Sequence, residues 1–76
     1  MTTRWIPVMK VTDGLFPSEK TVYINTVDGE VSVFVASARV NEAENRLNVV
    51  VLDEDATHSL IQVPSQGGTT IAKVPR

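Results

Sequence analysis

Apolar and polar residues alternate along much of the chain, and clusters of Gly, Pro, Asn and Asp interrupt the alternation. A period of two is typical of β-strands that bury one face. The alternating segments are rich in Val, Ile and Thr, which favour strands, and turn residues recur about every eight to twelve positions, as in small barrels and sandwiches. The pattern predicts six strands, at residues 4–12, 20–27, 30–38, 46–53, 57–63 and 69–74.

The predicted connections lie at 13–19, 41–45, 53–56 and 64–68, and the region around the second of them allows two interpretations. Within residues 37–47, Val40, Ala43 and Leu47 have near-helical spacing, and Ser37 is a suitable N-cap for a short helix. The two Asn residues and the strand patterns on both sides favour a hairpin connection instead.

The dipeptide Asp28-Gly29 predicts a hairpin with a two-residue type I′ turn. In that register Tyr23 lies directly opposite Phe34, and Val27 opposite Glu30, so that each pair shares a face. One face is then uniformly small or branched and is predicted to be the core: Val22, Ile24, Thr26, Val31, Val33 and Val35. The other face carries both aromatic residues of the hairpin.

Six short strands in a chain of 76 residues must close on themselves to bury an apolar face. We therefore predict a single all-β domain spanning residues 1–76. The favoured architecture is a small five- to six-stranded SH3-like barrel, or a compact β-sandwich of antiparallel hairpins, and an OB-like barrel ranks behind these. Pro7 lacks a backbone donor, which places the first strand at an edge of its sheet.

The charge pattern bears on the partner. The formal net charge is −2, and the seven basic residues are scattered singly along the chain, so nucleic acid is disfavoured. The alternative function, association with single-stranded nucleic acid, would stack bases on Tyr23 and Phe34 and use Lys20, Arg39 or Arg46 on phosphates. The chain has no cysteine, which favours the cytoplasm, and no apolar run long enough to span a membrane.

One segment has the residue types of a metal site. The sequence DEDATH brings Asp53, Asp55 and His58 together, but consecutive acids in a turn cannot all face one ion. Ser59 follows His58 directly and would point to the opposite face of a strand, which excludes that pair as nucleophile and base. We expect no cofactor and no enzymatic activity, and a small metal-dependent hydrolase is the least favoured function.

The four aromatic residues are the remaining candidates: Trp5, Phe16, Tyr23 and Phe34. In one interpretation the loop at 12–20 covers Tyr23 and Phe34 with Leu15-Phe16-Pro17 as a second, minor core. In the other, the aromatic residues are exposed and contact a protein partner or a second copy of the chain. The sequence thus favours a non-enzymatic protein-binding or assembly module.

Overall fold

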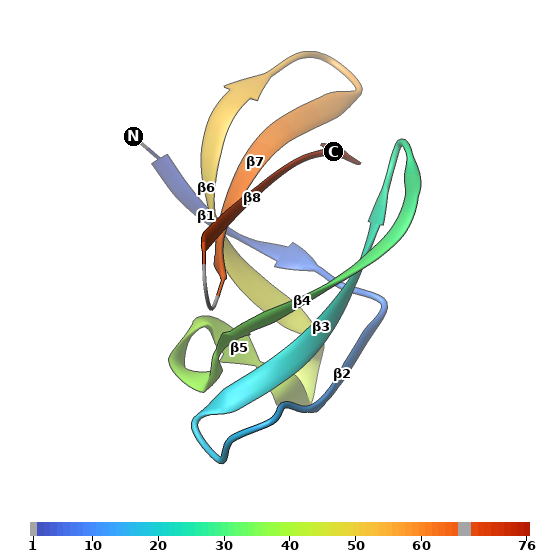
Figure 1. Cartoon of the computed structure of the whole chain (residues 1–76). Coiled ribbons are helices and arrows are strands. Elements are labelled where there is room, and N and C mark those ends of the chain that lie inside the picture. Colours follow the sequence, from blue (N-terminus) through green and yellow to red (C-terminus); the bar gives the residue numbers. More distant parts are fainter. Residues whose placement is uncertain (1, 66–67) are drawn as a thin grey trace.

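The structure, a computed structural model, describes residues 2–65 and 68–76 and consists mostly of antiparallel strands in two sheets (Figure 1). The strands are β1 (Thr2–Pro7), β2 (Lys10–Asp13), β3 (Glu19–Thr26), β4 (Gly29–Ala36), β5 (Val40–Asn41), β6 (Arg46–Glu54), β7 (His58–Ser65) and β8 (Gly68–Pro75). One sheet has the order β1-β6-β7-β8, with β5 paired to β6, and the other has the order β2-β3-β4. The predicted all-β fold is confirmed.

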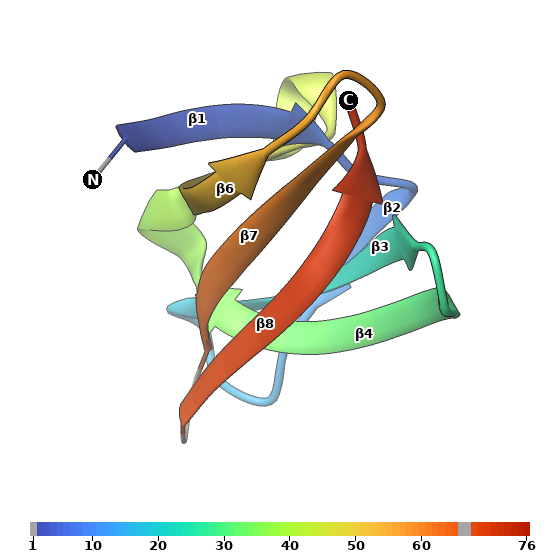
Figure 2. The same ribbon diagram turned by 90° about the horizontal axis from the view of Figure 1, so that it is seen from above.

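The two sheets enclose one core between them. Strand β3 lies beside β8 and β4 beside β7, and Figure 2 shows β8 crossing over the second sheet. The buried apolar side chains come from both sheets: Ile6, Val22, Ile24, Val33, Val35, Leu47, Val49, Ile61, Val63 and Val74. The pairing among the described strands does not close into a barrel, because each sheet keeps two end strands. The SH3-like and OB-like barrels are therefore not confirmed.

The predicted first strand, 4–12, is wrong as a single element. It breaks after Pro7, and the two pieces belong to different sheets as β1 and β2. Between them, Val8 N donates to Asn45 O at 2.9 Å and Met9 N donates to Tyr23 O at 2.9 Å, so one residue bonds to the turn that precedes β6 and the next bonds to β3. The prediction that Pro7 marks an edge strand is confirmed, since β1 ends its sheet.

The region 37–47 contains a hairpin connection, as predicted, but it joins β5 to β6 with Asn41 opposite Arg46, because β4 and β6 belong to different sheets, and the region does not form the alternative single helix. It consists of two single 3-10 turns, η1 (Ser37–Arg39) and η2 (Glu42–Glu44), on either side of the short strand β5. The side chain of Asn41 accepts from Glu44 N, and Asn45 has a left-handed backbone with φ of 52°. Both asparagines thus support turns, as Asn commonly does. The predicted turn at 64–68 includes residues 66 and 67, which lie outside the described residues.

The β3–β4 hairpin has a different register from the predicted one. Thr26 lies opposite Gly29, Tyr23 opposite Ser32, and Phe34 opposite Thr21. A type I′ turn would need positive φ at Asp28 and Gly29, but of these two only Gly29 has it, at 107°.

The contacts of the turn explain this displacement. Val27 N donates to Lys73 O of the facing sheet at 3.0 Å, and the Thr26 hydroxyl accepts from Asp28 N at 3.1 Å and donates to Gly29 O at 2.7 Å. These bonds place Val27 and Asp28 in the turn, where the prediction had Asp28 and Gly29. The pairing of β3 with β4 is therefore shifted by two residues from the predicted one. Because side chains alternate with a period of two, every residue keeps its predicted face.

Candidate functional site

The aromatic residues Tyr23 and Phe34 lie on the outer face of the β2-β3-β4 sheet, but as diagonal neighbours and not as a directly opposed pair. Tyr23 is half-buried, with Lys10 Nζ 5.6 Å from the centre of its ring, a cation–π contact. Phe34 is 41% exposed. The predicted face is correct, and the predicted pair is wrong.

The loop between β2 and β3 does not form a second core. Leu15 is 75% exposed and Phe16 is 66% exposed, and neither belongs to the buried cluster. The loop is held by polar contacts instead, because the buried Glu19 accepts from Leu15 N at 2.9 Å and its carbonyl accepts from Gly14 N at 3.1 Å. Phe16 therefore remains available for contact from outside.

Trp5 lies apart from the other aromatic residues, in a groove of about 380 Å³. Trp5 is 44% exposed and Met9 is 54% exposed. The groove lies between β1, the crossing at Val8 and Met9, the end of β3 and the end of β8. Its lining is Arg4, Trp5, Ile6, Pro7, Val8, Met9, Ile24, Asn25, Ser59, Val74, Pro75 and Arg76. Eight of these twelve residues are apolar, so the groove favours an apolar occupant.

The backbone of β1 adds hydrogen-bonding capacity to this groove. Residues of an antiparallel strand direct their backbone groups alternately toward and away from the paired strand. Val8 N donates to Asn45 O, on the same side as β6, so Trp5 directs its N–H and C=O groups away from β6, and Pro7, which has no N–H, directs its C=O group the same way. An unpaired edge of this kind can accept another strand.

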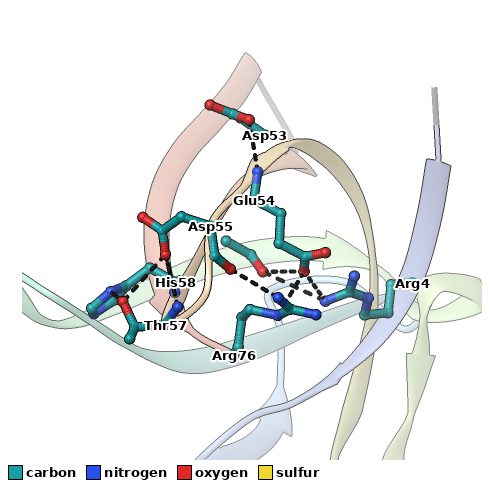
Figure 3. A network of polar contacts seen from close by, with 8 residues as sticks. Arg4, Asp53, Glu54, Asp55, Thr57, His58 and Arg76 are labelled. Atoms are coloured by element: carbon teal, nitrogen blue, oxygen red, sulfur yellow. Dashed lines mark hydrogen bonds and ion pairs between the residues drawn. The ribbon is translucent and has the colours of Figure 1, made fainter.

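One end of the groove is charged. Arg4 Nη1 lies 2.5 Å from Glu54 Oε2, and Arg76 Nε lies 3.5 Å from the same oxygen, which also accepts from the Ser59 hydroxyl at 2.7 Å (Figure 3). The Arg4 guanidinium, followed by the Ser59 hydroxyl, lowers the pKa of Glu54 from 4.5 to about 2, and the bond to Glu54 raises the pKa of Arg4. Glu54 therefore stays ionised through the ordinary pH range.

Asp53, Asp55 and His58, the residues of the hydrolase hypothesis, lie in or beside the turn between β6 and β7. Asp55 Oδ1 accepts from Thr57 N at 2.8 Å and from His58 N at 2.7 Å, and these bonds lower the pKa of Asp55. Asp53 Oδ1 accepts from Glu54 N, so it points away from this turn (Figure 3). Within the described ranges, no three His, Asp or Glu side chains are placed to hold a metal ion together. The sequence DEDATH here builds a backbone turn.

The basic residues of the nucleic-acid hypothesis are not gathered on the aromatic face. Lys20 lies 3.1 Å from Asp13 and 3.2 Å from Glu42, and these contacts raise its pKa. By strand alternation Lys20 points to the side opposite Tyr23. Arg39 Nη1 donates to Asn48 Oδ1 at 3.3 Å. Lys10 is the basic residue that contacts Tyr23, and it was not among the predicted phosphate contacts.

Sequence reasoning found Trp5 and missed the rest of the groove. Arg4, Met9 and Arg76 come from separate strands or connections, and no spacing along the chain relates them. The break after Pro7 was the one available signal, because a chain that leaves a strand there must change direction. The predicted site residues Tyr23, Phe34 and Phe16 do not line the groove.

Neither of the short helical turns in residues 2–65 and 68–76 has the length or apolar character needed to cross a membrane. Comparison of the chain with protein-family models, with curated proteins and with solved structures found no match.

Proposed function

We propose that the protein is a non-enzymatic protein-binding module that takes an extended segment of a partner polypeptide into the groove beside β1. The observation that supports this proposal is the coincidence of an apolar groove with the edge of β1 that pairs with no other described strand. Proteins that bind extended peptides at a sheet edge use both features: main-chain hydrogen bonds supply affinity, and adjacent hollows accept side chains.

The side chains at the rim suit this role. Trp5 and Met9 are large, apolar and about half-exposed, and residues of these types are enriched at protein interfaces. A tryptophan that becomes covered by a partner is a frequent centre of binding energy. Trp5 is the only tryptophan of the chain, so its fluorescence reports directly on the occupancy of the groove.

The aromatic surface predicted from the sequence is thus divided into two parts. We assign segment binding to Trp5, because the groove combines a hollow with a strand edge. Tyr23, Phe34 and Phe16 lie outside the groove and remain candidates for contact with the rest of a larger partner. With no cysteine in the chain, we place this interaction in the cytoplasm.

The test uses peptides selected on the intact protein from a random twelve-residue display library. Selected peptides are synthesised and titrated against the protein, and occupancy of the groove is expected to shift the Trp5 emission to shorter wavelength with saturation. Met9→Ser is expected to weaken this binding about tenfold, and Ile71→Ser is expected to leave it unchanged. Ile71 is a matched control because it is 60% exposed and lies outside the groove.

Two results would reject the proposal. One is a library selection that yields no peptide able to shift the Trp5 emission. The other is equal loss of binding in Met9→Ser and Ile71→Ser, which would mean that apolar surface in general, and not the groove, holds the peptide.

A further inference from the structure

The groove has an uneven charge. Arg4 and Arg76 both line it, and they share one carboxylate, that of Glu54, which is not among the lining residues. The lining thus holds two guanidinium groups and no carboxylate, because the neighbouring acids Asp53 and Asp55 also lie outside it. A groove with this local charge attracts an acidic group.

Both arginines keep hydrogen-bonding capacity. A guanidinium carries five N–H donors. Among the described residues, Arg4 makes its contacts to Glu54 and Ser59 through Nη1, and Arg76 makes its contacts to Glu54 and Asp55 through Nε and Nη1. The Nη2 atoms of both side chains are thus left for a further acceptor. A carboxylate is the best-matched one, because its two oxygens can take parallel N–H donors.

The alternation of side chains along β1 determines how far apart the acidic residue and the apolar residue of the partner segment lie. Arg4 and Trp5 are consecutive residues of β1 and so point to opposite faces of the strand. In a segment paired with β1, the residue opposite Arg4 lies on the Arg4 face, and the residue opposite Trp5 lies on the Trp5 face. The two partner residues are therefore consecutive as well.

We infer that the groove selects an extended partner segment in which an acidic residue stands directly beside a large apolar residue. The carboxylate bonds to Arg4 and Arg76, and the apolar side chain packs on Trp5 and Met9. This inference rests on the proposed function and adds to it the chemistry of the partner. The inference specifies the charge of one partner residue and its position directly beside the large apolar residue. Synthetic peptides can change the charge and the position separately.

The experiment uses the selected peptides and variants of the intact protein. We expect Asp or Glu to be enriched next to a large apolar residue in the selected sequences. Replacing that Glu by Gln in a synthetic peptide is expected to weaken binding about tenfold, as the loss of a charge-assisted bond would. Moving the Glu by one position, with the composition unchanged, is expected to weaken binding to a similar extent.

The matching protein variant is Arg76→Gln, which keeps the backbone bond from Arg76 N to Thr57 O. It is expected to weaken the Glu peptide about tenfold and the Gln peptide less than twofold. Lys73→Gln is the control, because Lys73 is a nearby cation outside the groove lining. Thermal unfolding of each variant establishes that it is folded under the binding conditions.

The outcomes separate the two proposals. If selected peptides shift the Trp5 emission but bind equally well with Gln in place of Glu, the acidic inference is wrong and the binding function stands. Equal weakening of both peptides by Arg76→Gln also overturns the inference, since the residue then acts without regard to the partner's charge. If no peptide shifts the emission, both proposals fail.

Discussion

The guanidinium of Arg4 and the carboxylate of Glu54 join the edge strand β1 to the far end of β6. β1 pairs with β6 along its whole length, and Arg4 lies opposite Val49 within that pairing. Glu54 lies beyond Val51, the last residue of β6 that pairs with β1, and there Arg76 and Ser59 also meet its carboxylate. The cluster therefore fixes the edge of the groove, and its protonation state bears on stability.

Acid should weaken the fold through Glu54. Its pKa is about 2 in the folded protein, against 4.5 without these partners. A carboxyl group with a lowered pKa in the folded state stabilises the fold above its unfolded pKa, and that contribution is lost as the pH falls toward the folded value. Melting temperatures of the wild type and Glu54→Gln should therefore differ at pH 6 and converge between pH 4.5 and about 2. A difference that does not depend on pH would contradict this origin.

A matched pair of leucines tests where the core lies. Leu47 is fully buried between the sheets, whereas Leu60 lies on the outer face of β7 and is partly exposed. Leu47→Ala should lower the free energy of unfolding by about 2–5 kcal/mol because it leaves a cavity. Leu60→Ala should cost no more than about 1 kcal/mol. Urea denaturation measures both, and comparable losses would argue against the assigned faces.

The β3–β4 turn makes a prediction about glycine. Gly29 has a φ of 107°, a conformation that a residue with a Cβ adopts only with strain. Gly29→Ala should therefore destabilise the fold by about 1–2 kcal/mol. Gly68→Ala is the control, because a Cβ at that position meets no atom of the described residues within 4 Å and its φ lies outside the strained range. Chemical denaturation that shows no difference between these variants would exclude the observed turn geometry.

Substitution by threonine should destabilise the fold to different extents at two neighbouring residues of β4. Val35 is fully buried and Phe34 is 41% exposed, because consecutive residues point to opposite faces. Val35→Thr keeps the shape but buries a hydroxyl, and should cost about 1–3 kcal/mol. Phe34→Thr should cost no more than about 1 kcal/mol. A larger loss from Phe34→Thr, measured by thermal or urea unfolding, would show that Phe34 is covered in solution.

The faces of the strands could be predicted from the sequence, but the pairing of the hairpin could not. Val22, Ile24, Val33 and Val35 are buried as predicted, because side-chain alternation is a local property of extended backbone. The register moved by two residues because Val27 N bonds to Lys73 O, and that contact joins segments more than forty residues apart. A shift of two leaves the face pattern intact, so the pattern alone cannot distinguish the two registers.

For the candidate site, too, the sequence predicted local features but not the contacts between distant segments. By itself the sequence determined an all-β fold, the buried face of each hairpin strand, the edge position of the strand that contains Pro7, and Trp5 as a residue of interest. The tertiary structure decided the break between β1 and β2, the two-sheet arrangement, and the groove in which Arg4, Met9 and Arg76 meet. Alternation and turn chemistry act between near neighbours in the chain, whereas a groove forms where strands distant in sequence fail to pair.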